Sequence, residues 1–190
     1  MSYFPAFIKL DNIKILIIGG GYIAYEKLTH LVEFTTNIEV IAKDYSDNMI
    51  NLIQQYNIKY EQRAYNLGDI KNFGLVIIAI DDIPLQNDIF NEAKQYPKCL
   101  VNSVDSTDYC DFIFPSYIKK GDLTIAISTS GSSPAVAKHL KTYLKDLIPN
   151  SIVDFLTNMK NYRKTMPKGK KRMEFLDNKA KEYIQKWNKK

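Results

Sequence analysis

The chain of 190 residues is long enough for one full α/β domain and a small additional part, and too short for two full-sized domains. Hydrophobic residues make up 45% of the sequence and charged residues 25%, which is typical of a globular protein and argues against disorder. No apolar run approaches the roughly 18 residues of a membrane span, and the N-terminus lacks a signal-peptide pattern. The 2 cysteines and 2 histidines are isolated, which argues against a zinc site or a disulfide scaffold. We therefore expect a soluble, cytoplasmic protein without a membrane partner.

The net charge of +5 is distributed unevenly along the chain. From Lys160 onward the basic residues far outnumber the three acidic ones, whereas the preceding part of the chain carries a net negative charge. An acidic body with a basic tail predicts that the tail meets an anionic partner. A solvated helical face would give the same pattern, so both interpretations stay open at this point.

Strand and helix patterns alternate over the first hundred residues. The run from Ile13 to Ile18 is rich in β-branched residues and ends in glycines, as a buried parallel strand does. Further strands are expected at residues 38–42, 58–61, 75–80 and 99–103, and helices at residues 22–34, 46–56 and 84–93. Five strands separated by helices predict a Rossmann-like, doubly wound parallel sheet, which is an α/β fold.

The pattern changes after residue 112. Two strands, at residues 112–118 and 123–128, flank residues 119–122, which is typical of a hairpin. Ser133 and Pro134 fit the N-cap and first position of a helix that runs to about Leu147. Amphipathic helices follow at residues 151–165 and 170–187, with Met173 and Ile184 expected on the apolar face of the second. The chain therefore divides into residues 1–112, a small α+β part at 113–147 and a basic helical tail at 148–190.

The glycine-rich segment directly after the first strand fits G-x-G-x-x-A, from Gly19 to Ala24. In such a motif, Gly19 permits the tight turn, and Gly21 lets the backbone approach a pyrophosphate. The phosphates then lie at the positive end of the following helix, near the N–H groups of Tyr22 and Ile23. The motif predicts dinucleotide binding. The alternative is a glycine-rich turn without a ligand.

Acidic and polar residues follow the other predicted strands. Lys43 and Asp44 follow the second strand, where an acid commonly binds the ribose hydroxyls of NAD; Lys43 would equally accommodate a 2′-phosphate, so NAD and NADP both stay open. Asp81 follows the fourth strand and Asp105 the fifth. A carboxylate at this edge, facing a nicotinamide, would serve as a general base, and the alternative is a turn or N-cap aspartate. Asp105 is our candidate catalytic residue.

A polar loop of small residues precedes the helix that starts at Pro134. Such loops bind carboxylates or phosphates through backbone N–H and hydroxyl groups. Capping the helix needs only one of these residues, so the length of the loop favours a substrate-binding role. The candidate substrate-binding residues are Ser128, Thr129, Ser130, Gly131 and Ser132.

These motifs, in this order, resemble the precorrin-2 dehydrogenase/sirohydrochlorin ferrochelatase family, the N-terminal module of siroheme synthase, here in a stand-alone form. The resemblance covers residues 1–147, and the last forty residues match only in being helical and basic. Two departures stand in the loop: Ser130 replaces a glycine of many members, and Thr129 replaces a serine that is modified in some. The matching segments are YFPAF at 3–7, GGGYIAYEK at 19–27, AIDD at 79–82, VNSVD at 101–105, CDFIFP at 110–115 and AISTSGSSPAVA at 126–137.

The resemblance implies NAD-dependent oxidation of precorrin-2 to sirohydrochlorin in siroheme biosynthesis, with insertion of Fe²⁺ as a further activity of many members. It implies an NAD-binding domain at 1–112, a homodimer that interlocks through 113–147, and a catalytic role for Asp105. No resident metal site is expected. The expected NAD-contacting residues are Gly19, Gly21, Tyr22, Ile23, Lys43, Asp44, Ala79, Asp81 and Asn102.

Two alternatives accompany this interpretation. The first is a dehydrogenase that does not insert metal. The second is an NAD-sensing regulator that binds nucleic acid through its basic tail. A nucleic-acid surface would place exposed aromatic residues among the basic ones. Phe175, Tyr183 and Trp187 instead recur at the spacing of a helix core, so we expect a tetrapyrrole as partner and no nucleic acid.

Overall fold

The computed structural model describes residues 3–104 and 107–187, so the candidate catalytic residue Asp105 lies outside the described residues. The chain forms two compact units, Tyr3–Ile113 and Phe114 to the C-terminus. The boundary lies one residue from the division expected at 112/113. The second expected division, at 147/148, stays a prediction. The hairpin and the helical tail share one cluster of buried side chains.

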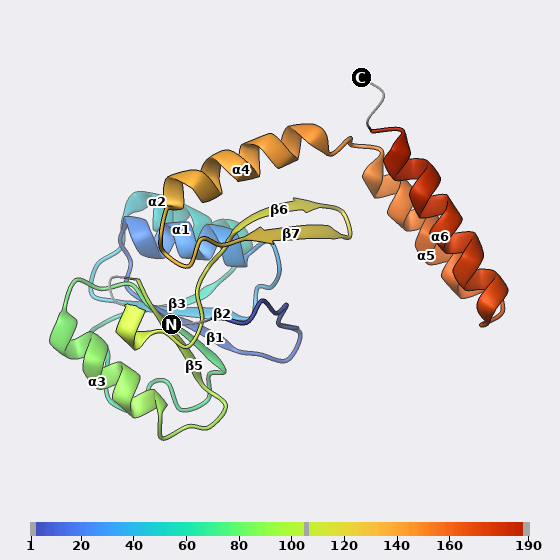
Figure 1. Ribbon diagram of the computed structural model, residues 1–190. Helices are drawn as coiled ribbons and strands as arrows, with labels where there is room; N and C mark the ends of the chain where they lie inside the picture. The colour runs from blue at the N-terminus through green and yellow to red at the C-terminus, as the bar shows by residue number, and fades with distance from the viewer. Residues whose placement is uncertain (1–2, 105–106, 188–190) are drawn as a thin grey trace. The chain divides into compact units, whose positions relative to one another are not determined.

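The first unit is a five-stranded parallel sheet with the strand order β3-β2-β1-β4-β5, flanked by helices (Figure 1). This order confirms the predicted doubly wound, Rossmann-like fold, with the strand order changing direction between β1 and β4. The strands are β1 Ile15–Ile18, β2 Ile38–Ala42, β3 Lys59–Gln62, β4 Leu75–Ile78 and β5 Leu100–Ser103. The helices are α1 Tyr22–Leu31, α2 Asp47–Tyr56, α3 Ile83–Ala93 and the short 3₁₀ helix η1 Thr107–Tyr109.

The two central strands have a purely apolar sequence because both of their faces are covered. Every residue of β1 and β4 is buried, and the two strands pair from Ile15 opposite Leu75 to Ile18 opposite Ile78. Strands enclosed on both sides lose the alternation of polar and apolar residues. The same runs that predicted the strands therefore also form the core of this unit.

Some predicted strands and helices were longer than those in the structure. The first strand begins at Ile15 and not Ile13, because Ile13 N–H closes a turn to the carbonyl of Leu10. The fourth strand ends at Ile78 and not Ile80, because the Ile80 carbonyl accepts a hydrogen bond from the Gln86 amide. The first helix ends at Leu31, where a turn follows.

The second unit begins with a β-hairpin, as predicted, followed by three helices (Figure 1). The first hairpin strand starts at Ser116 and not at residue 112, and it continues through Lys120 to a tight turn. Gly121 has a φ of 58° in this turn, which favours glycine. The elements are β6 Ser116–Lys120, β7 Leu123–Ile127, α4 Pro134–Leu147, α5 Ile152–Thr165 and α6 Lys170–Gln185.

The core of the second unit joins the hairpin to the helical tail. Ile118 of β6, Ile148 and Ile152 form its buried centre, and Tyr183 and Trp187 pack against them. The expected apolar face of α6 is correct for Tyr183 and Trp187 and wrong for two other residues. Leu176 is the buried residue of α6, whereas Met173 in its first turn is 71% exposed and Ile184 is 48% exposed.

Candidate active site

The turn between β1 and α1 needs glycine at two positions because other segments approach its backbone closely. A Cβ atom on Gly19, whose φ is 125°, would lie 2.1 Å from the carbonyl oxygen of Ala79. A Cβ atom on Gly20 would lie 2.2 Å from the carbonyl oxygen of Asp44. The turn therefore lies against the ends of β4 and β2. The motif identified Gly19 but not Gly20, which occupies one of its variable positions.

Gly21 differs from its two neighbours because its surroundings are open. A Cβ atom on Gly21 would meet no atom of the described residues within 4 Å. Gly21 is also the N-cap of α1, where no side chain in the described part of the chain caps the helix. The N–H groups in the first turn of a helix have no acceptor within the helix. This open, donor-rich helix start fits the phosphates of a dinucleotide.

The residues after β2 are fixed next to this turn. The N–H of Ser46 donates to the carbonyl of Gly20 at 2.9 Å. The Tyr45 hydroxyl donates to the carbonyl of Glu61 at 2.7 Å, and burial raises the pKa of Tyr45 to about 12, so the hydroxyl keeps its proton. The backbone that carries Lys43 and Asp44 is therefore held in place, while both side chains are exposed. In the described residues neither side chain forms an ion pair.

The remaining residues of the cofactor set lie at the same edge of the sheet. Tyr22 and Ile23 open α1 and are exposed, whereas the buried face of the helix consists of Ala24, Leu28 and Leu31. The Tyr22 hydroxyl donates to Glu26 at 3.0 Å, and this bond raises the pKa of Tyr22. Ala79 directly follows β4 and contacts Gly19, and Asp81 is exposed two residues later.

Asn102 is placed differently from the other members of this set. It is 5% exposed, and its amide nitrogen donates to the carbonyl of Phe112 at 2.9 Å. Its amide oxygen is buried and has no hydrogen-bond partner among the residues that the structure describes. The bond to Phe112 holds the segment after η1 beside β5. Contact of Asn102 with the cofactor stays a prediction.

A polar cluster at the end of β5 was missed by the sequence analysis. The Cys110 thiol donates to the carbonyl of Ser103 at 3.0 Å, and the Ser103 hydroxyl donates to the fully buried Gln86 at 2.6 Å. Burial raises the pKa of Cys110, and burial lowers the pKa of the Lys27 ammonium, which interacts with this thiol. Gln86 lies on the buried face of α3 together with Ile89, Glu92 and Ala93, and nothing in the local sequence links it to Ser103. The cluster fixes the strand that leads to Asp105.

The Ser128–Ser132 loop belongs to the second unit. Two of its hydroxyl groups stabilise the loop by accepting hydrogen bonds from nearby backbone N–H groups. The Ser128 hydroxyl accepts from Ser130 N–H and the Thr129 hydroxyl from Ser133 N–H, both at 3.1 Å. Ser133 is the N-cap of α4, as expected, and accepts from Val136 N–H. Ser130, Gly131 and Ser132 are exposed, and their contact with the substrate stays a prediction.

The loop backbone has an unusual conformation at Ser130, where this chain departs from the family pattern. Ser130 has a φ of 50°, followed by Gly131 with a φ of 84°. The left-handed region favours glycine, which is the residue many family members carry where this chain has Ser130. The serine therefore adopts a backbone conformation that a glycine would reach at lower cost.

Within residues 3–104 and 107–187, no three His, Cys, Asp or Glu side chains are grouped so that they could hold a metal ion. In the same ranges, no helix has both the length and the apolar character needed to cross a membrane.

The glycine turn at the point where the strand order reverses, together with the open start of α1, defines a dinucleotide-binding protein of the Rossmann class. Comparison with family models agrees. Residues 6–116 match the family described as "Putative NAD(P)-binding", and residues 120–147 match "Sirohaem biosynthesis protein central". The chain belongs to the precorrin-2 dehydrogenase/sirohydrochlorin ferrochelatase family, and its cofactor is a nicotinamide dinucleotide.

Individual relatives show the same relationship. The siroheme synthase of Pseudoalteromonas translucida is 33% identical over 163 residues, which cover 86% of this chain and 34% of that protein. The siroheme synthase of Neisseria meningitidis serogroup C is 34% identical over 154 residues, covering 81% and 32%. The chain thus spans about a third of the length of the curated relatives it matches. A solved structure named SirC, precorrin-2 dehydrogenase, has the same fold, with a TM-score of 0.76, 21% identity and coverage of 99% of this chain and 100% of that chain.

Proposed function

We propose that the protein is a cytoplasmic, NAD-dependent dehydrogenase that oxidises precorrin-2 to sirohydrochlorin in siroheme biosynthesis. The observation that carries the proposal is the open glycine turn at the start of α1, in a chain that matches a putative NAD(P)-binding model and a sirohaem biosynthesis model. NAD⁺, when bound, accepts a hydride from the substrate. The reaction also releases one proton, which a base of the protein has to take up.

Each step has a candidate residue in the chain. The N–H groups of Tyr22 and Ile23 bind the phosphates, and the exposed carboxylate of Asp44 binds the ribose hydroxyls. Asp44 favours NAD over NADP, because a carboxylate repels a 2′-phosphate. Asp105 follows β5 by two residues in the sequence, at the edge where the parallel strands end, and we assign it the role of proton acceptor.

The basic tail suits an anionic substrate. The three acidic residues after Lys160 are each paired with a lysine of α6, in the pairs Lys170–Glu174, Lys181–Asp177 and Lys179–Glu182. Arg163, Lys164, Lys168 and Lys171 form no ion pair with a described residue, so much of the unpaired positive charge lies around the turn between α5 and α6. A tetrapyrrole carries several carboxylates on an apolar ring, and it would meet these cations and the donors of the Ser130–Ser132 loop.

We further propose that the enzyme is a homodimer built through α4. Four apolar side chains recur every three or four residues along this helix and are exposed, although the adjacent face of α4 packs on the hairpin. A stripe of this kind on a soluble helix marks a protein interface. It fits a second copy of the chain, which the family resemblance also implies. The stripe consists of Val136, Leu140, Tyr143 and Leu147.

Insertion of Fe²⁺ into sirohydrochlorin remains an implication of the family resemblance, with Fe²⁺ as a substrate. The test of the whole proposal is incubation of the protein with precorrin-2 and NAD⁺. We expect NADH and sirohydrochlorin to appear together in the absorption spectrum, with slower turnover when NADP⁺ replaces NAD⁺. A subsequent addition of Fe²⁺ tests siroheme formation. No NADH formation by a folded protein that binds NAD⁺ would contradict the dehydrogenase assignment.

A further inference from the structure

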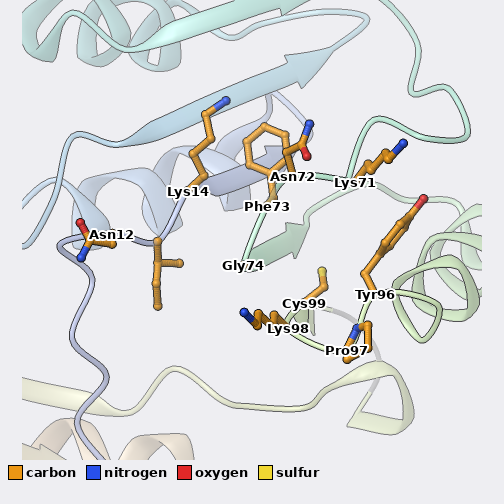
Figure 2. A pocket seen from close by; sticks show the side chains of 11 residues that line it. Asn12, Lys14, Lys71, Asn72, Phe73, Gly74, Tyr96, Pro97, Lys98 and Cys99 are labelled. Carbon is orange, nitrogen blue, oxygen red and sulfur yellow. The ribbon is translucent and has the colours of Figure 1, made fainter.

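The first unit contains a pocket of about 690 Å³ on the side opposite the glycine turn (Figure 2). Three chain segments line it: residues 12–14, 71–74 and 96–99. These segments directly precede β1, β4 and β5, so the pocket lies at the amino edge of the parallel sheet. The glycine turn follows β1 at the carboxyl edge. A strand of four residues separates the two sites by about 13 Å.

The wall of the pocket is largely apolar. Ile13, Pro97 and the rings of Phe73 and Tyr96 contribute to it (Figure 2). Several backbone donors here are already used; Gly74 N–H, for example, donates to the carbonyl of Lys14 at 2.9 Å. Burial raises the pKa of the adjacent Cys99 thiol to about 11, so this group is neutral as well. A ligand would therefore meet rings and aliphatic groups on the wall and side-chain groups at the rim.

The charged groups of the rim are all positive. Lys14, Lys71 and Lys98 line the pocket, and none of its lining residues is acidic. Lys14 is occupied, because its ammonium group lies 2.8 Å from Glu39 and 4.8 Å from the centre of the Phe73 ring. Lys71 and Lys98 are exposed and form no ion pair with any residue that the structure describes. Two ammonium groups without an ion pair in the described residues and two aromatic rings thus line the same pocket.

We propose that this pocket is a second ligand site, which binds a small planar aromatic molecule with an acidic group. The ring of the ligand contacts Phe73 and Tyr96, and its acidic group pairs with either Lys71 or Lys98, which lie on different sides of the pocket (Figure 2). Pockets for small molecules typically have volumes of about 300 to 1,000 Å³, mostly apolar walls and a few polar groups that fix orientation. The site does not depend on the proposed function, because its residues and its test involve neither NAD nor turnover.

The probe is 1-anilinonaphthalene-8-sulfonate, a planar aromatic sulfonate whose fluorescence rises in apolar surroundings. We expect the double variant Lys71→Ala/Lys98→Ala to bind it about fivefold more weakly, because an exposed ion pair contributes up to about 1 kcal/mol. The control is Lys9→Ala/Lys59→Ala, which removes the same charge from two exposed lysines outside the pocket. The control should bind the probe as the unmodified protein does.

The position of the probe is measured by amide chemical shifts of the full chain. We expect the largest shifts at Phe73, Gly74 and Cys99, and no displacement of the probe by saturating NAD⁺. Displacement by NAD⁺ would place the probe at the glycine turn and overturn the proposal. So would equal affinity of the two double variants, or shifts that leave the segments before β4 and β5 unchanged. Thermal unfolding of each variant shows that it is folded.

Discussion

Neighbouring glycines in the β1–α1 turn should respond to the same substitution in opposite ways. The structure gives Gly20 no room for a side chain, since a Cβ atom would lie 2.2 Å from the Asp44 carbonyl oxygen. Gly21 has room, and its φ of −83° and ψ of −166° are accessible to alanine. Gly20→Ala is therefore expected to affect folding, and Gly21→Ala is expected to affect cofactor binding.

The expected magnitudes follow from these surroundings. Gly20→Ala requires a backbone shift at the end of β2, and overpacking of this kind costs about 1–3 kcal/mol. For a chain of this size, that lowers the Tm by roughly 2–12 °C. Gly21→Ala should change stability by less than about 0.5 kcal/mol. Its methyl group keeps the phosphates from the helix start, and each lost hydrogen bond to a charged group costs about 1.5–3 kcal/mol, or roughly 10- to 100-fold in NAD affinity.

Thermal unfolding measures the first effect, and calorimetric titration with NAD⁺ measures the second. Gly21→Asp extends the series, because it adds a negative charge at the same place and should abolish binding. A folded Gly21→Asp protein with unchanged NAD affinity would show that the dinucleotide binds elsewhere. A Gly20→Ala protein with unchanged Tm would contradict the close approach of Asp44.

Three further outcomes are expected. Asp105→Ala should slow oxidation of precorrin-2 by about 10²- to 10⁴-fold while calorimetry shows unchanged NAD binding; full activity would remove Asp105 from the mechanism. Leu140→Glu should convert the proposed dimer to a monomer in analytical ultracentrifugation with little loss of monomer stability, since Leu140 is exposed; a dimer that persists would exclude α4 as its interface. Replacing Arg163, Lys164 and Lys168 by Gln should weaken tetrapyrrole binding at low salt and leave it unchanged at high salt; equal binding at low salt would identify a solvated surface.

Local patterns were enough to predict most elements of the fold. The apolar runs of β1 and β4 and the Ser133-Pro134 pair at the start of α4 each produced the expected element, because local sequence and tertiary structure favour the same conformation there. The end of the hairpin strand β6 was less predictable. Lys119 and Lys120 look like turn residues in the sequence, but the sharp bend at Gly121 leaves both in the strand.

The parts of the candidate site that escaped prediction depend on contacts between distant segments. Gly20 is needed because the carbonyl of Asp44 approaches it, and nothing local to Gly20 indicates that contact. Lys27 and Cys110 are far apart in the sequence, and only the packing of α1 and the segment after η1 brings the two side chains close together. The motif therefore predicts the cofactor turn, whereas the polar groups that support the end of β5 are brought together only by the tertiary structure.

The tail combines two properties that have to be tested separately. Some of its aromatic residues belong to the core of the second unit: Tyr183 and Trp187 pack on the cluster that contains Ile118 of the hairpin and Ile152 of α5. Cutting off the tail would expose this apolar surface, and any loss of activity would then have two explanations. The cations replaced here, Arg163, Lys164 and Lys168, lie around the α5–α6 turn and not in this core, and Arg163 is exposed. Neutral substitutions at the turn leave the core intact, so a change in substrate affinity that disappears at high salt reports on charge alone.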